Sequence, residues 1–363
     1  MKARFKEVPL TLNSVALGTI GLAGAADLLI QKIPNLNEVQ AFRFTLFVYI
    51  FCIALALFYM IINAIKHIYY YKSVKENLKK PNTIGSFGIN FLSTLAINNG
   101  ISWIINKCAS DEIKHQLLYI PNLIVILVVI AQFIYSIYFI KNILMKPANW
   151  QGEVFTTWFV PLVGISICIT HIQNLGNILP LLFFQIIWFW AFAFFIWFFP
   201  LVLYKFFFKP HPNSADIPSM AIFASPANLM ALGFLVAFDP SSTVKTVFNN
   251  QIFYNIISVY LFCLSSVGIM IYMVILAKTL RLHRLKMSWS ALTFPASISA
   301  IGTLKFADLF FHSSNTNFIG INEFFTAVAV VLFTISLCVV AFINIIYLEL
   351  LFEKLISKKK FKY

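Results

Sequence analysis

Ten apolar stretches, each long enough to cross a lipid bilayer, make up most of this chain. A bilayer core about 30 Å thick requires about 20 apolar residues per helix. The stretches cover residues 8–29, 43–65, 82–105, 117–140, 155–175, 179–205, 217–238, 252–277, 288–310 and 322–352. Their apolar residues are continuous rather than alternating, which excludes a transmembrane β-barrel. The sequence therefore predicts an all-α polytopic membrane protein with ten transmembrane helices, in a single domain over residues 1–363.

Charge is sparse and unevenly distributed along the chain. Hydrophobic residues make up 60% of it and charged residues 11%, with a mean hydropathy of +0.84. If the N-terminus is cytoplasmic, 21 Lys and Arg residues fall on the cytoplasmic side and five outside, and Lys305 lies within a span. The positive-inside rule then places both termini in the cytoplasm, which an even number of spans requires. The net charge of +14 therefore reflects the orientation of the chain in the membrane. We expect a plasma-membrane (inner-membrane) protein in contact with lipid, and no nucleic-acid partner.

The ten stretches alternate in character. Nine of the 13 glycines lie in odd-numbered stretches, and mid-stretch prolines occur in the fifth, seventh and ninth, as Pro161, Pro226 and Pro295. Proline removes a backbone donor and kinks a helix. The freed carbonyl is tolerated in a membrane only against protein or a water-filled cavity. Paired in order, the stretches predict five helical hairpins, with an inner ring of odd helices around a central pore. For single glycines, close helix packing is the alternative interpretation.

The predicted pore is polar but almost uncharged. Hydroxyl and amide side chains crowd the third and ninth stretches, whereas carboxylates lie near stretch ends. Such a pore with one lysine favours anions over cations. Lys305 has a second interpretation, in which it snorkels to the interface and pairs with Asp308 one turn away. The candidate residues of an anion pathway are Lys305, Thr293, Ser297, Thr303, Ser225 and Asn90.

Phe294 directly precedes Pro295 and is a candidate constriction. It lies eleven residues before Lys305, almost three helical turns, so the two side chains are expected on the same helix face. A phenyl ring across the pore would block hydrated ions. From position alone, packing against a neighbour is the simpler interpretation, because Phe294 is one of 40 phenylalanines.

Three segments in order along the chain carry a family resemblance. They are the glycine-rich start of the chain (Gly18-Thr-Ile-Gly21-Leu-Ala), Ala224-Ser225-Pro226, and the ninth stretch with Trp289, Thr293-Phe294-Pro295 and Thr303-Leu-Lys305. With them, the chain resembles the tellurite-resistance/dicarboxylate transporter family over nearly all ten stretches. That family includes bacterial TehA proteins, fungal malate permeases and plant guard-cell slow anion channels.

The resemblance implies a trimer in which each protomer has its own pore, lined by five odd helices and occluded by a phenylalanine of the ninth. Phe294 matches that gate. The third stretch departs from the family pattern because it lacks a central proline. Whether this stretch is kinked like the others stays an open question.

The function we expect is a gated anion channel that conducts small monovalent anions. The alternative is a secondary transporter of C4-dicarboxylates or tellurite; chloride, nitrate, formate and malate all remain open as substrates. Proton coupling commonly uses an intramembrane carboxylate or histidine, and dicarboxylate capture favours paired arginines. In the odd stretches the carboxylates and His171 lie near the ends, and no paired arginines occur. An enzyme, a cofactor and a metal are not expected, because the histidines and the five cysteines are scattered.

Overall fold

In the computed structural model of the protein, 89% of the described residues are helical. It describes residues 8–9, 11–79, 81–146, 156–175, 178–208, 217–240, 250–282, 287–311 and 319–355, and no strand occurs among them. The basic chain ends that carry part of the topology prediction, residues 1–7 and 356–363, lie outside these ranges.

Each of the ten predicted ranges contains at least one helix. In chain order these are α2 (Leu12–Ile30), α3 (Glu38–Tyr69), α4 (Tyr71–Asn77), α5 (Pro81–Phe87), α6 (Ile89–Cys108), α7 (Asp111–Phe139), η1 (Ile140–Leu144), η2 (Thr156–Trp158), α9 (Phe159–Leu162), η3 (Gly164–His171), α10 (Leu181–Phe208), η4 (Ile217–Phe223), α11 (Ala224–Ala237), α12 (Gln251–Leu280), η5 (Met287–Leu292), α13 (Thr293–Phe311) and α14 (Ile319–Leu355).

Seven segments of the described chain are long and apolar enough to cross a membrane. They are α2, α3, α7 with η1, α10, η4 with α11, α12 and α14. The predicted ranges 82–105, 155–175 and 288–310 fall short of that length or hydropathy, because their helices are interrupted or polar. The structure therefore supports a bundle of apolar helices without fixing the number of crossings at ten.

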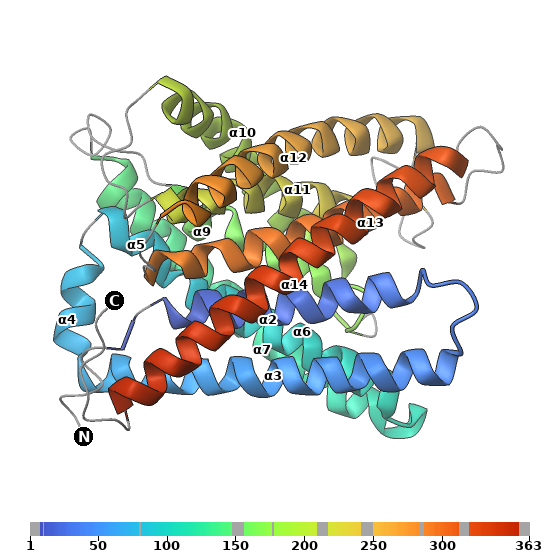
Figure 1. Ribbon diagram of the computed structural model, residues 1–363, viewed down its shortest axis with the longest axis horizontal. Helices are drawn as coiled ribbons and strands as arrows, with labels where there is room; N and C mark the ends of the chain where they lie inside the picture. Colours follow the sequence, from blue (N-terminus) through green and yellow to red (C-terminus); the bar gives the residue numbers. More distant parts are fainter. Residues whose placement is uncertain are drawn as a thin grey trace.

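Burial separates the helices into two classes. Within its most apolar window, α2 is 72% buried and the η4–α11 segment 89% buried. The corresponding figure is only 33–44% for α3, α7, α10, α12 and α14. Figure 1 shows α3 and α12 at opposite edges of the bundle, with α2 and α13 between them. Helices from odd-numbered ranges thus form the interior, and the plain helices expose Leu, Ile and Phe around them.

The prolines mark a change of helix type. In the fifth, seventh and ninth ranges a 3₁₀ segment leads into an α-helix whose third residue is proline: Pro161 in α9, Pro226 in α11 and Pro295 in α13. The sequence places these prolines in the middle of a helix, whereas in the structure each stands just after the junction of a 3₁₀ and an α segment. Each proline lies in the first α-helical turn, where its missing N–H is least costly. The third range is interrupted without a proline, at Gly88 between α5 and α6.

The described ends of the first and last helices lie together. The Thr11 hydroxyl, just before α2, is 2.8 Å from the hydroxyl of Tyr347 near the end of α14. The Tyr347 hydroxyl also donates to the carbonyl of Met287, where η5 begins, at 2.6 Å. The start of α2 and the end of α14 therefore share one end of the bundle, as an even number of crossings requires.

Candidate functional site

Two cavities inside the bundle meet at Phe294. The smaller has a volume of about 40 Å³, and the larger about 380 Å³. The smaller, here the apolar cavity, is lined by Ser14, Leu17, Ile89, Leu92, Phe159, Val160, Val163, Gly164, Ile222, Ser225, Pro226, Leu229, Ser290, Ala291, Phe294 and Pro295. The larger, here the polar cavity, is lined by Ile20, Gly21, Gly24, Asp27, Leu28, Gln31, Tyr49, Ala96, Asn99, Gly100, Trp103, Asn106, Lys107, Ile167, Thr170, Gln173, Asn174, Leu232, Val236, Phe294, Ile298, Ile301 and Lys305. Among the described residues, Phe294 is the one that lines both.

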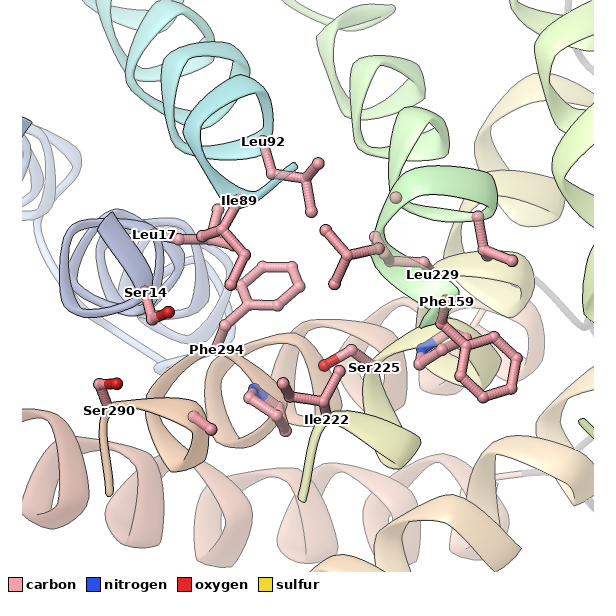
Figure 2. A pocket seen from close by; sticks show the side chains of 16 residues that line it. Ser14, Leu17, Ile89, Leu92, Phe159, Ile222, Ser225, Leu229, Ser290 and Phe294 are labelled. Carbon is pink, nitrogen blue, oxygen red and sulfur yellow. The ribbon is translucent and has the colours of Figure 1, made fainter. Parts of the chain in front are cut away.

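Every residue lining the apolar cavity comes from the five odd-numbered ranges. In the fifth, seventh and ninth ranges, the residue directly before the proline lines this cavity: Val160, Ser225 and Phe294. The change from 3₁₀ to α-helix at these prolines therefore places the residue that precedes each proline at the cavity wall. The Phe294 ring lies among Leu17, Ile89 and Leu92, with Leu229 across the cavity (Figure 2).

The apolar cavity contains three hydroxyl groups. The Ser225 hydroxyl is buried and has no hydrogen-bond partner among the described residues, and Ser225 is only 6% exposed. Figure 2 shows the Ser225 oxygen turned toward the cavity, with the Ser14 oxygen on the opposite side. Ser290 contributes the third hydroxyl, which donates to the carbonyl of Met287 at 3.1 Å. Ser225 thus offers a free donor in a wall that is otherwise mostly hydrocarbon.

One face of α13 lines the polar cavity. Its residues Phe294, Ile298, Ile301 and Lys305 recur every three or four positions and all border the cavity, which is the period of an α-helix. The expected shared face of Phe294 and Lys305 is confirmed. Lys305 is partly buried, and no hydrogen bond or ion pair engages its ammonium in the part of the chain that the structure describes.

Asp308 does not pair with Lys305, although that was the alternative interpretation of the lysine. The Asp308 carboxylate instead forms an ion pair with Lys32, which follows the end of α2. Asp308, the partner expected one turn away along α13, thus pairs with Lys32 instead. The Lys305 ammonium remains available to the polar cavity.

Three candidate pathway residues of α13 lie outside both cavities. Thr293 donates to the carbonyl of Ser14 at 3.0 Å, and Ser297 donates to that of Gly18 at 3.1 Å. Thr303 donates to the carbonyl of Ser299 within its own helix at 2.9 Å. All three are fully buried. Their hydroxyls contribute to helix packing and backbone hydrogen bonding rather than to either cavity.

Asn90 also lies outside the two cavities. Its side-chain oxygen accepts hydrogen bonds from the amide groups of Asn13 and Asn63, the latter at 3.1 Å. These three asparagines join α2, α3 and α6. Of the six predicted pathway residues, the structure brings Ser225 and Lys305 to the cavities with Phe294.

The family model described as voltage-dependent anion channel (SLAC1) matches residues 7–348. The chain belongs to this family. The resemblance seen in the sequence is thereby confirmed, and the protein is a multi-pass membrane protein of a family of anion channels and transporters, which is not an enzyme family. A comparison with curated proteins gives no match.

The polar cavity is also lined by residues that the sequence did not predict as site residues. Its charged groups are Asp27, Lys107 and Lys305, and its uncharged polar groups are Gln31, Tyr49, Asn99, Trp103, Asn106, Thr170, Gln173 and Asn174. The spacing of Asn99, Trp103 and Asn106 is a helical one, and could have identified a polar face on α6. In the part of the chain that the structure describes, no three His, Cys, Asp or Glu side chains lie together where they could hold a metal ion.

Proposed function

We propose that the protein is a gated anion channel that conducts small monovalent anions such as chloride or nitrate, and that Phe294 is its closed gate. The observation that carries the proposal is the position of Phe294, which alone of the described residues lines both cavities. An ion that passes from one cavity to the other must pass its ring.

The dimensions of the apolar cavity support a closed state. A cavity needs about 10–15 Å³ to hold one water molecule, so a volume of about 40 Å³ holds only a few. Hydrocarbon walls do not replace the hydration shell of an ion, and hydrophobic constrictions of this kind close pores by losing water. Moving the Phe294 ring aside would join the small cavity to the large one and admit a hydrated path.

The side chains on either side of Phe294 favour anions. Lys107 and Lys305 line the polar cavity, and the free hydroxyl of Ser225 lines the apolar one. A hydroxyl hydrogen can donate to an anion, and an ammonium attracts one through its charge. The described wall of the apolar cavity includes no carboxylate.

The remaining features of the proposal follow from the family and from the charge distribution. The protein would be a homotrimer with one pore per protomer, ten crossings arranged as five hairpins and a single domain over residues 1–363. It would lie in the plasma membrane with both termini in the cytoplasm. Membrane lipids and small inorganic or organic anions would be its partners, without nucleic acid.

Substitution of Phe294 by alanine tests the gate. We expect Phe294→Ala to raise anion conductance at least tenfold over the wild type in planar bilayers, because removal of the ring opens the passage between the cavities. Phe306→Ala is the matched control on the same helix, since Phe306 stacks on Phe262 away from both cavities. A correctly assembled Phe294→Ala protein with wild-type current would show that Phe294 is not the gate.

The second candidate function is secondary transport of C4-dicarboxylates or tellurite. The observation that favours it is the pair of lysines in the polar cavity, which provides two positive charges for one doubly charged substrate. Reversal potentials separate the two functions. A channel follows the anion gradient alone, whereas a coupled transporter shifts its reversal potential with pH at a fixed anion-to-proton ratio.

A further inference from the structure

The polar cavity contains a negative charge in a pathway proposed for anions. Asp27 is the one carboxylate among the described residues that line it. The side chain comes from α2, one turn before the end of that helix at Ile30. Lys107 comes from the end of α6 and Lys305 from α13. Three helices thus bring one negative and two positive side chains to the same cavity.

The Asp27 carboxylate is held in place by an uncharged group. The Gln31 amide donates to its Oδ1 at 3.1 Å, and Trp103 lines the same cavity. Neither lysine comes within the 4 Å of a direct ion pair with Asp27 in the described part of the chain. The charges of both lysines nevertheless act on the carboxylate. The lysines therefore stay open to a diffusing ion, while the carboxylate lowers the positive potential that they create.

The effect of this carboxylate depends on the charge of the ion. The energy of an ion in a given potential is proportional to its own charge. Asp27 therefore opposes the entry of a doubly charged anion twice as strongly as that of a singly charged one. Two lysines and one aspartate leave a net charge of +1 in the cavity, and weak attraction of this kind lets a monovalent anion both enter and leave.

We propose that Asp27 is a specificity-determining residue that shifts the selectivity of the polar cavity from doubly charged toward singly charged anions. This inference rests on the proposed channel function and adds to it the charge class of the substrate and the residue that sets it. Sulfate and doubly ionised dicarboxylates are the anions that Asp27 discriminates against.

The test uses the permeability ratio of sulfate to chloride, measured from reversal potentials in planar bilayers. Phe294→Ala serves as the parent, so that current is large enough to measure. We expect Asp27→Asn to raise the sulfate-to-chloride ratio at least threefold. Asparagine keeps the shape of the side chain and its acceptor for Gln31 while removing the charge. Asp27→Glu, which keeps the charge, should stay within twofold of the parent.

Two further variants make the result specific to the cavity. Asp308→Asn removes a negative charge from α13, but Asp308 pairs with Lys32 and does not line the polar cavity. It should leave the ratio unchanged. Lys305→Met removes a positive charge from the cavity and should lower the ratio. Raising the salt from 0.1 M to 1 M should weaken both effects, because the Debye length falls from about 10 Å to about 3 Å.

The outcomes separate this inference from the channel proposal. An unchanged ratio in assembled Asp27→Asn, or an equal rise in Asp308→Asn, overturns the role of Asp27 and leaves the channel intact. If Asp27→Asn fails to assemble, an unchanged ratio in Lys305→Met overturns the role of the cavity charge. Absence of any anion current in the Phe294→Ala parent overturns the channel proposal, and the role of Asp27 with it.

Discussion

At the level of single residues, Gly18 shows how closely the interior helices approach one another. A Cβ atom on Gly18 would lie 2.3 Å from the Cβ of Thr293 and 2.8 Å from its carbonyl carbon. Real Cβ atoms do not come that close to other heavy atoms. Gly18 is therefore required by the contact between α2 and α13, the helix that carries Phe294. Close packing, the alternative interpretation of the glycines, holds at this position.

Substituting Gly18 tests this contact. We expect Gly18→Ala to lower the free energy of unfolding by about 1–3 kcal/mol, the usual cost of overpacking a well-packed interior. Reversible unfolding in detergent, followed by circular dichroism, measures it. Gly320→Ala is the matched control, because no atom lies within 4 Å of the corresponding Cβ position. Equal stability of Gly18→Ala and wild type would contradict the tight contact.

The sequence predicted some site residues and misplaced others because polarity alone gives neither the direction in which a side chain points around its helix nor its hydrogen-bond partner. Phe294 and Lys305 were compared by their spacing, and the spacing placed both on the cavity face. Thr293, Ser297 and Thr303 were chosen because they are polar. At 100° per residue, Thr303 lies nine positions and thus half a turn from Phe294. Residue type alone does not distinguish a pore-lining hydroxyl from one that bonds to a neighbouring backbone.

At the level of helices, the interruption in the fifth range depends on α7. The break around Pro161 leaves backbone carbonyls without intrahelical donors, and α7 supplies the replacements. Gln132 donates to the carbonyl of Val160 at 3.1 Å and to that of Pro161 at 3.4 Å. Ser136 also donates to the Pro161 carbonyl. The sequence predicted that freed carbonyls would need partners, but which helix provides them depends on tertiary contacts.

Removing the donor on α7 tests this arrangement. We expect Gln132→Leu to destabilise the protein by about 1 kcal/mol, because buried carbonyls lose a partner while membrane hydrogen bonds are individually weak. Thermal unfolding in detergent measures the loss. Asn142→Leu removes an exposed amide from η1, which bonds only the Tyr138 carbonyl, and should leave the midpoint unchanged. A midpoint for Gln132→Leu equal to that of Asn142→Leu would argue against the role of Gln132.

At the level of the whole molecule, the contrast between two classes of helices was predictable because it depends on composition. Polar, glycine-containing stretches became the buried helices, and uniformly apolar stretches became the exposed ones. The number of crossings was harder to establish, because a helix lining a polar cavity does not need high hydropathy. The third range illustrates this: α5 and α6 are separated at Gly88, and α6 contains Asn98 and Asn99.

Cysteine labelling decides whether this third range crosses the membrane. Lys72 in α4 precedes it and Cys108 at the end of α6 follows it, and both are exposed. The charge distribution predicts that Lys72 is cytoplasmic and Cys108 external. A membrane-impermeant maleimide should therefore label Cys108 in intact cells, and this labelling should disappear in Cys108→Ser.

On the Cys108→Ser background, Lys72→Cys should react only after the cells are permeabilised. Cys52 and Cys168 are buried, and Cys263 and Cys338 lie within the apolar helices α12 and α14. Any labelling that remains in Cys108→Ser measures the reaction of these four cysteines. Labelling of both positions from the same side would mean that α5 and α6 enter and leave on one face. That result would contradict an odd number of crossings between Lys72 and Cys108, and with it the five-hairpin arrangement around Phe294.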